Sequence, residues 1–435
     1  MRFPLVFGFV ALVGATGCRS TQQDAPASMP VSPDGQVGQV GEQALERLKP
    51  GVWRGVLRSP GGELPFGLEI PADGSKPVIL NAAERAPIDR IRPTSNGVIF
   101  EIDLYDAVIE GEWRESRLVG RWQKRARQGT SQLPFEATHG YPYRFKPGGS
   151  APSTPGSSIA GTWSMTFTDE DGPFIGQAEL QQEGTKVIGT ILTTTGDYRY
   201  LEGDFGDGRL RLSTFDGAHA FLFTASVDDQ GQLKGDFWSR DTYHATFVAQ
   251  RKTDERALFD PYREVEVTAE DERMTFRFPD VDGRIVSSED DRFRGKVVLI
   301  DIFGTWCPNC NDLAPLLVEW HKKYSGQGLE IVGLAFEFTD DVDDANDRLR
   351  AYVAHHDIPF PVLRAGVSDK DAASTRVPAL ERVKSYPTTV FIGRDGKISR
   401  VHSGFAGPAT GDHYVQTVAS MEAEIQRLLG AQSAD

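Results

Sequence analysis

The sequence has no excess of basic side chains and no apolar run long enough to cross a membrane. Its 47 Lys and Arg residues are outnumbered by 62 Asp and Glu residues, for a net charge of −15. This charge repels phosphate backbones, so nucleic acid is not an expected partner. The apolar run at residues 3–13 falls short of the ~20 residues that a membrane-spanning helix requires. At 435 residues the chain exceeds one ordinary core, which predicts two or three domains.

The amino end has the pattern of a secretory signal. MRFPLVFGFVALVGATGC combines one basic residue, a short apolar run and small residues, which predicts a signal peptide over residues 1–17. Its ending resembles the lipobox of bacterial lipoproteins, with Ala15 where that family usually has Leu. The resemblance implies lipid on the sulfur of Cys18; a plain secretory signal is the alternative. Arg19 is not an acidic inner-membrane retention signal, which favours the outer membrane.

Residues 19–43 contain no aromatic side chain and cannot bury enough surface to fold, so we expect a lipidated tether over 18–46. The stretch FKPGGSAPSTPGSSI has a similar composition and indicates a linker. The remaining boundaries follow from these changes in composition. The expected order is a β unit at 47–146, a linker at 147–158, a second β unit at 159–252, a connector at 253–269 and an α/β domain at 270–435.

The two β units look like duplicates. Gly51-Val52-Trp53 is matched by Gly161-Thr162-Trp163, and the run ending at Trp122 is matched by the run ending at Trp238. Short segments such as FEIDL and AFLFTASV alternate in polarity between turn signals, which is typical of strands. We therefore predict two duplicated all-β units, each a barrel or sandwich of about eight strands. The recurring tryptophans suit core positions.

After residue 270 strands alternate with helices. The buried run Val297–Phe303 precedes a helical pattern over 307–324, and 329–336 is a further buried strand. This alternation predicts parallel strands in an α/β sheet. Asp395-Gly396 indicates a hairpin, and the last segment places apolar residues on one helical face.

Cys307-Pro308-Asn309-Cys310 lies where the first of these strands meets its helix. The helix amino end favours a thiolate on Cys307, and Cys310 lies close enough to attack a mixed disulfide formed there. A zinc site would need two further ligands, and none is near in sequence. A purely structural disulfide would close too small a loop to stabilise much. We therefore interpret the pair as a redox reagent, without metal or cofactor.

The motif and its surroundings resemble the extracytoplasmic TlpA/ResA-like thiol-disulfide oxidoreductases, which have a thioredoxin fold, over about residues 276–429. Besides WCPNC, the matching features are a buried acid six residues before the first cysteine, a helix-kinking proline and a cis-proline turn. At these positions the sequence has Asp301, Pro315 and Tyr386-Pro387. The resemblance implies that Asp301 takes the proton of Cys310, that Pro387 is cis, and that Trp306 and Tyr386 face the substrate. Leu313 stands where many relatives have a glutamate.

These features predict an enzyme that reduces disulfides in partner proteins, on the periplasmic side of a bacterial envelope, recycled by a membrane thiol reductant. Two alternatives stay open: a disulfide donor, and an envelope lipoprotein whose β units bind a ligand or partner. The acidic stretch Glu337–Asp347 lacks the spacing of a calcium loop and is expected to be solvated, as is the helix end His355-His356.

Overall fold

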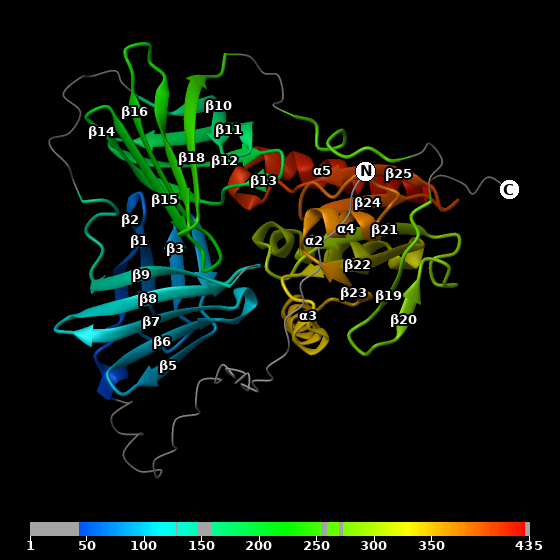
Figure 1. Cartoon of the computed structure of the whole chain (residues 1–435), viewed down its shortest axis with the longest axis horizontal. Helices are drawn as coiled ribbons and strands as arrows, with labels where there is room; N and C mark the ends of the chain where they lie inside the picture. The colour runs from blue at the N-terminus through cyan, green and yellow to red at the C-terminus, as the bar shows by residue number, and fades with distance from the viewer. Residues whose placement is uncertain (1–42, 128, 147–157, 254–258, 269–272, 431–435) are drawn as a thin grey trace, which may run out of the picture.

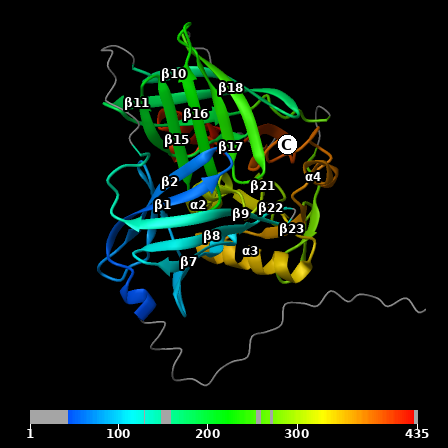
Figure 2. The same cartoon turned by 60° about the vertical axis from the view of Figure 1, so that its left-hand side comes forward.

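The computed structural model describes residues 43–127, 129–146, 158–253, 259–268 and 273–430. Two β-sheet units form one side of the molecule and an α/β domain forms the other (Figure 1). Turning the molecule brings both units in front of that domain, so both face it (Figure 2). The predicted fold class is confirmed: two all-β units precede an α/β domain.

The first β unit is an open antiparallel sheet in the order β4-β3-β2-β1-β9-β8-β7-β6-β5, with β4 and β5 as its edges. The pairing of β1 with β9 brings the two ends of the unit together. Its strands are β1 (Gly51–Ser59), β2 (Gly62–Ile70), β3 (Val78–Asn81), β4 (Glu84–Pro87), β5 (Arg90–Thr94), β6 (Gly97–Ile102), β7 (Ala107–Arg114), β8 (Arg117–Arg125) and β9 (Thr130–His139), with a short 3-10 turn η1 (Asp103–Tyr105).

The second β unit closes into a barrel, because β11 pairs with both β10 and β12. Closure leaves only the two-residue strand β13 outside the ring of paired strands. Its strands are β10 (Gly161–Asp169), β11 (Gly172–Glu183), β12 (Lys186–Thr193), β13 (Gly196–Asp197), β14 (Leu201–Gly206), β15 (Arg209–Phe215), β16 (Ala220–Val227), β17 (Leu233–Ser239) and β18 (Tyr243–Arg251).

The second unit helps to fill the core of the open first unit. Phe215 and Leu222 of the barrel are buried among first-unit side chains, and the Phe215 ring lies 4.6 Å from that of Phe66. Nε1 of Trp122 donates a hydrogen bond to the carbonyl oxygen of Gly217 at 3.2 Å. The two units therefore share a hydrophobic core although their sheets are separate.

The tryptophan pairs test the duplication directly. Nε1 of Trp53 donates to the Lys49 carbonyl and Nε1 of Trp163 to the Ile159 carbonyl, each four residues earlier in the chain. Both indoles are buried, as predicted.

The predicted equivalence of Trp122 and Trp238 is wrong. Trp238 is half-buried, and the buried residue at the place equivalent to Trp122 is Phe237. Strand alternation explains the difference: Leu118 and Trp122 are four residues apart on one face, and so are Leu233 and Phe237.

The carboxyl-terminal domain is built on a five-stranded sheet in the order β23-β22-β21-β24-β25. β21 to β23 are parallel, and β24 and β25 form the antiparallel hairpin that Asp395-Gly396 predicts. The five strands of this sheet are β21 (Val297–Phe303), β22 (Leu329–Glu337), β23 (Val362–Val367), β24 (Thr388–Ile392) and β25 (Ile398–Ser403), and a separate two-stranded sheet consists of β19 (Arg277–Pro279) and β20 (Ile285–Ser287). The helices of the domain are α2 (Pro308–Tyr324), α3 (Val342–His356), α4 (Lys370–Arg376) and α5 (Asp412–Gly430), with 3-10 turns η2 (Ser325–Gln327) and η3 (Pro408–Thr410).

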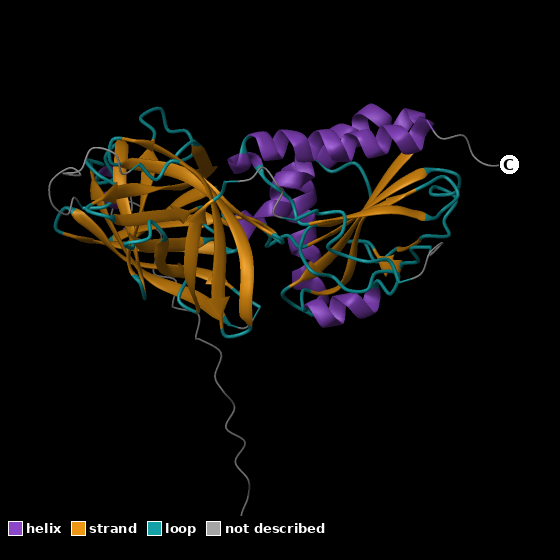
Figure 3. Cartoon of the chain, turned by 90° about the horizontal axis from the view of Figure 1, so that it is seen from above, coloured by secondary structure: helices purple, strands orange, loops and turns teal. Residues whose placement is uncertain are grey.

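The helices cover both faces of this sheet (Figure 3). Val297 and Leu299 of the central strand pack with apolar side chains of α2 and α5, including the predicted α5 face. Val298 and Ile300 point to the other face, where Leu349 of α3 is buried. Because both faces are covered, β21 is buried along its whole length, as its apolar sequence predicts.

Both β units bind the α/β domain through ion pairs. From the first unit, Arg125 contacts Asp344 at 2.7 Å and Arg127 contacts Asp369 at 2.7 Å. A third pair joins Arg348 of α3 to Asp106 of the first unit, also at 2.7 Å. From the second unit, Glu179 binds His413 at the start of α5 at 2.6 Å. The β units are thus docked at several points on one side of the domain.

Candidate active site

Cys307 and Cys310 form a disulfide at the amino end of α2, with their Cα atoms 5.3 Å apart. Cys307 is the N-cap residue of the helix, and the backbone N–H of Cys310 points to its sulfur at 3.3 Å. Pro308 occupies the first helical position, where it has no N–H to leave unpaired. The unpaired amides of this helix end can stabilise negative charge on Cys307 after reduction.

The sequence turns from β21 into α2 through side chains that hold the backbone around the cysteines. Nδ2 of Asn311 donates to the carbonyl oxygens of Thr305 at 3.2 Å and Cys307 at 2.9 Å. Oδ1 of Asn311 lies 2.8 Å from Nε2 of His356 at the end of α3. Burial lowers the pKa of His356 to about 4, so the neutral ring donates this hydrogen bond. The expectation that this helix end is solvated is wrong for His356.

The Tyr386–Pro387 peptide bond is cis, as the resemblance implies. The carbonyl oxygen of Tyr386 lies 3.3 Å from Sγ of Cys307. A backbone segment from a different part of the chain therefore lies directly against the first sulfur. The parts that Pro387 and Tyr386 play in substrate binding stay predictions.

Asp301 lies in the centre of β21 and is buried, with 3% of its surface exposed. Within the described residues, its Oδ1 atom has no hydrogen-bond partner. Burial alone raises its pKa to about 8, so the carboxyl is largely protonated at neutral pH. The alternative of a solvent-facing strand-end aspartate is excluded, and its role as a proton acceptor stays a prediction.

Trp306 is half-buried beside the disulfide. Its Nε1 atom donates to the Phe336 carbonyl at 2.9 Å, and its ring stacks on Phe338 with centroids 4.5 Å apart. The ring also lies edge-on to Tyr386 at 5.4 Å. Trp306 and Tyr386, both predicted to contact the substrate, line one cleft between the two β units and the α/β domain. We call it the interdomain cleft. Its lining includes Arg127, Ser131, Arg240, Thr242, Trp306, Ser368, Lys370 and Tyr386.

Sequence reasoning missed the role of Glu337 by placing it in a solvated stretch. Its carboxylate is buried at the end of β22 and accepts hydrogen bonds from the backbone N–H of Thr305 at 2.9 Å and its hydroxyl at 2.8 Å. Burial raises its pKa. The only sequence signal was its place at the end of an apolar strand; the acidic residues after it obscured that signal. Asp341, farther along, caps α3 as an ordinary helix start.

The second β unit reaches into the motif, which no sequence pattern indicates. Asp197 accepts a hydrogen bond from Nδ2 of Asn309, the residue between Pro308 and Cys310, at 3.2 Å. Arg199 forms an ion pair with Asp312, two residues after Cys310. The active-site helix is therefore held by a different domain.

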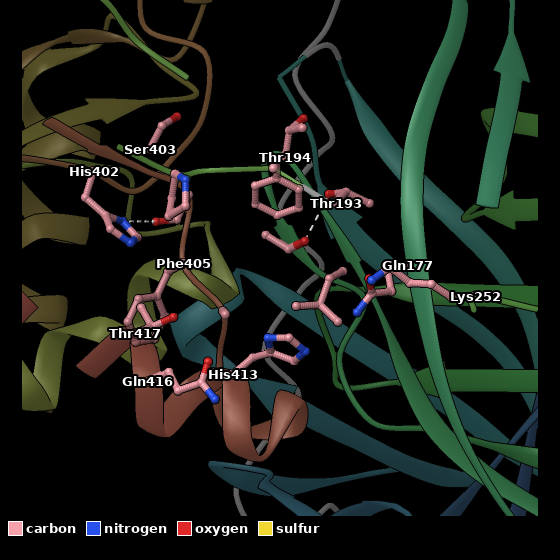
Figure 4. A pocket seen from close by; sticks show the side chains of 16 residues that line it. Gln177, Thr193, Thr194, Lys252, His402, Ser403, Phe405, His413, Gln416 and Thr417 are labelled. Atoms are coloured by element: carbon pink, nitrogen blue, oxygen red, sulfur yellow. Dashed lines mark hydrogen bonds between the residues drawn. The ribbon is translucent and has the colours of Figure 1, made fainter. Parts of the chain in front are cut away.

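A second cavity lies between the barrel and the α/β domain (Figure 4). Gln177, Thr193 and Thr194 face it from the barrel, and Phe405 and His413 face it from the other side. Within the described residues, Oε1 of Gln177 is buried without a hydrogen-bond partner. Because none of its lining residues also lines the interdomain cleft, the two cavities are separate.

Several predicted features lie outside the described residues: the signal peptide, Cys18, nearly all of the tether and nearly all of the linker. Among the helices that are described, none has the length and apolar content needed to span a membrane.

Comparison with known proteins finds a matching family model and relatives for the carboxyl-terminal domain. Residues 269–401 match the model of the AhpC/TSA family. ResA from Bacillus cereus, a thiol-disulfide oxidoreductase, is 30% identical over 127 residues, which cover 29% of this chain and 65% of ResA. The match thus spans just under two thirds of that relative. The thioredoxin-like protein YneN from Bacillus subtilis is 27% identical over 150 residues, covering 34% and 79% of the two chains.

Among solved structures, a thiol:disulfide interchange protein of the thioredoxin family from Chlorobium tepidum aligns with 21% identity and a TM-score of 0.28. The alignment covers 37% of this chain and 99% of that one. The family model and the relatives cover the same third, and the carboxyl-terminal domain is a thioredoxin-fold domain with ResA-like relatives.

Proposed function

We propose that the protein is an extracytoplasmic thiol-disulfide oxidoreductase that reduces disulfides in partner proteins. One observation carries the proposal: Cys307, which is disulfide-bonded to Cys310, caps α2 with its Sγ 3.3 Å from the Tyr386 carbonyl oxygen. This arrangement combines a stabilised nucleophile, a neighbouring second sulfur and an adjacent backbone segment. The ResA relatives support the same chemistry.

In the reducing direction the reaction has two exchanges. The Cys307 thiolate attacks one sulfur of the substrate disulfide, forming a mixed disulfide and releasing the other sulfur as a thiolate. Cys310 then attacks Sγ of Cys307, which regenerates the enzyme disulfide and releases the second substrate sulfur. Two electrons pass from the cysteine pair to the substrate. An external thiol reductant returns them; a membrane protein is the expected source.

Cys310 must lose its proton before it attacks. Asp301 is the proposed acceptor: it is a buried carboxyl six residues before Cys307 whose pKa is raised to about 8. A base of this strength is matched to a thiol, because its conjugate acid and an ordinary cysteine have similar pKa values. Tyr352, whose hydroxyl donates to the Cys310 carbonyl at 3.2 Å, fixes the backbone of this residue.

The substrate segment is proposed to enter through the interdomain cleft, where Trp306 and Tyr386 face it. Both β units contribute to this cleft, through Arg127 of the first and Arg240 of the second. The signal peptide and Cys18 predict secretion and a lipid anchor on the periplasmic side of the outer membrane. In a protein anchored there, the interdomain cleft is accessible to proteins of the cell envelope and not to cytoplasmic proteins.

The decisive experiment traps the mixed disulfide. In the full chain with Cys18→Ser, Cys310→Ser removes the resolving thiol, so Cys307 should accumulate covalent adducts with disulfide-containing proteins. The variant Cys307→Ser is the matched control and should form none. Equal trapping by both variants would overturn the assignment of Cys307 as the nucleophile.

A second candidate function has one observation in its favour. Gln177 lines the cavity in Figure 4, and its Oε1 atom, which has no partner in the part of the chain that the structure describes, suits a ligand that donates a hydrogen bond. This is the envelope-binding alternative, in which the β units carry the main function. The double variant Cys307→Ser, Cys310→Ser separates the two: its phenotype should match a deletion under the redox proposal and the wild type under the binding one.

A further inference from the structure

The side chain of Asn309 lies within the cysteine motif but points into the second β unit. Its Nδ2 atom donates to Oδ1 of Asp197 at 3.2 Å and to the carbonyl oxygen of Phe405 at 3.0 Å. The backbone N–H of Gly407 donates to the same Oδ1 atom at 2.8 Å. Asp197 and Asn309 expose only 4% and 8% of their surfaces. The position of Asn309 is therefore fixed by a buried carboxylate of the second β unit together with a backbone carbonyl of its own domain.

The chain around Asp197 is shaped for this close approach. Gly196 has a φ of +144°, and a Cβ atom there would lie 2.5 Å from Nδ2 of Asn309. Asp197 also accepts a hydrogen bond on Oδ2 from the backbone N–H of Arg199 at 3.0 Å, which orients the carboxylate. Gly404, next to Phe405 in the same loop, lies so near the barrel that a Cβ atom there would be 3.3 Å from the carbonyl oxygen of Thr194. The contact is thus part of a packed interface.

The charges around this contact are predominantly negative. Arg199 is buried and binds Asp312 of α2, Glu84 of the first β unit at 2.7 Å and Asp216 of the second at 3.3 Å. Together with Asp197, four carboxyl groups lie around one arginine. Burial raises the pKa of Asp312 to about 6 and that of Glu84 to about 7, so Asp312 is mainly ionised and Glu84 partly ionised at neutral pH. The first turns of α2 therefore face an excess of negative charge.

This charge lies at the helix end that stabilises the Cys307 thiolate. The positive end of the helix dipole favours an anion there, and a fixed carboxylate beside the same turn opposes a second one. A less stable thiolate disfavours the reduced dithiol, and a disfavoured dithiol is a stronger reductant. The second β unit is placed to adjust the chemistry of the cysteine pair without touching the sulfur atoms.

We propose that Asp197 is a positioning residue through which the second β unit lowers the reduction potential of the Cys307/Cys310 pair, by fixing Asn309 and placing a carboxylate at the amino end of α2. The inference rests on the proposed function, because it requires that the cysteine pair exchange with thiols. It gives the β units a direct part in the redox chemistry.

The test is the equilibrium of the full chain with glutathione, in a Cys18→Ser background. In this reaction the protein disulfide gains two electrons and two protons, and glutathione is oxidised to its disulfide. Asp197→Asn should shift the equilibrium constant about tenfold toward the reduced protein, equivalent to about 30 mV. The pH at which Cys307 is half alkylated should fall in the same variant, a change that a merely structural role would not produce.

The matched control is Asp228→Asn. Asp228 also accepts backbone hydrogen bonds in a turn of the second β unit, but its partners, Gln230, Gln232 and Lys234, belong to that unit. This control should leave the equilibrium constant unchanged. If Asp197→Asn does not fold, Asp312→Asn provides a second test, since it removes a carboxyl of the same group from α2 and should shift the equilibrium in the same direction.

An equilibrium constant within twofold of the wild type in the folded variants would overturn the inference. That result is distinguishable from failure of the proposed function. In the latter case the wild-type disulfide itself would not exchange with glutathione.

Discussion

Glu337 lies at the end of β22 and holds Thr305, two residues before Cys307, through both the backbone N–H at 2.9 Å and the hydroxyl at 2.8 Å. A single buried carboxylate thus fixes the loop that leads into the cysteine motif. The two neighbouring strands β21 and β22 are joined at this point by a side chain as well as by their ladder.

Replacing this carboxylate should loosen the loop before Cys307. Glu337→Gln retains one acceptor oxygen but presents an amide where a second acceptor is needed, which leaves one Thr305 donor without a partner. We expect the rate of disulfide exchange to fall by roughly tenfold with little change in substrate affinity, because about 1 Å of misplacement can cost that much or more. Stopped-flow measurement of mixed-disulfide formation tests this.

Glu330→Gln is the control for that variant, because Glu330 lies on the same strand but is only half-buried. An unchanged exchange rate in Glu337→Gln, or an equal loss in both variants, would contradict the role assigned to the Glu337 carboxylate.

Asp301 should give the resolving step a pH dependence. Its pKa of about 8 means that the carboxylate form grows as the pH rises toward 8, so release of substrate from the mixed disulfide should accelerate over that range. Asp301→Asn should slow release about 10- to 100-fold at pH 7 and move the rise to higher pH, because Cys310 must then lose its proton to solvent. Single-turnover release between pH 6 and 9 measures this, and an identical profile in the variant would exclude Asp301 as the acceptor.

The Asp301 carboxyl, which should assist the resolving step, should also lower the stability of the folded protein at neutral pH. The folded state binds the Asp301 proton more tightly than the unfolded state, whose carboxyl has a pKa of ~3.9, so stability should fall as the pH rises from about 4 to about 8. Asp301→Asn should therefore raise the free energy of unfolding by ~2–4 kcal/mol at pH 7 and have little effect near pH 4. Urea denaturation at both pH values distinguishes this from a pH-independent change.

Arg199 should be essential for the docking of the three structural parts. Removing it in Arg199→Met leaves Glu84, Asp216 and Asp312 as buried acids without their shared cation, a loss that costs about 3–5 kcal/mol in buried ion pairs. We expect a clear drop in the thermal midpoint. Arg263→Met, at an exposed ion pair, should leave the midpoint unchanged. A midpoint equal to that of the wild type in Arg199→Met would show that the network does not hold the parts together.

The interdomain cleft predicts a charge preference. Arg240 lines the cleft from the second β unit, and burial lowers its pKa, which marks it as poorly compensated by neighbouring carboxylates. Arg240→Glu should slow the reduction of peptide disulfides flanked by acidic residues several-fold relative to those flanked by lysine. The exposed Arg121→Glu should not change that ratio. Loss of both reactions to the same extent would show that Arg240 does not select the substrate.

The parts of the site that are local in sequence could be predicted from it. The motif Cys307 to Cys310 lies where a buried strand meets a helix, and Asp301 lies within that strand, so short-range patterns identify both. The alternation of polarity likewise identified two β units. These features need only the chain's own periodicity and do not depend on how distant segments pack.

Contacts between distant segments could not be predicted in this way. Asp197 and Asn309 are separated by 112 positions, and neither stands in a motif that indicates the other. The sequence predicts a solvated stretch from Glu337 onward because many of the residues after it are acidic, whereas the burial of Glu337 itself depends on its place at the end of β22. The wrong pairing of Trp122 with Trp238 has a similar origin. The two residues match by type, but the alternation of side chains along β17 places Phe237 on the inner face.

The reduction potential of the Cys307/Cys310 pair in the full chain decides whether the protein donates or accepts electrons in disulfide exchange. Equilibration with dithiothreitol or glutathione, followed by alkylation and mass measurement, gives the value. We predict a potential close to that of thioredoxin, about −270 mV, as expected of a reductant whose thiolate faces neighbouring carboxylates. A potential near about −120 mV, like that of a strong periplasmic oxidant, would contradict it and identify a disulfide donor.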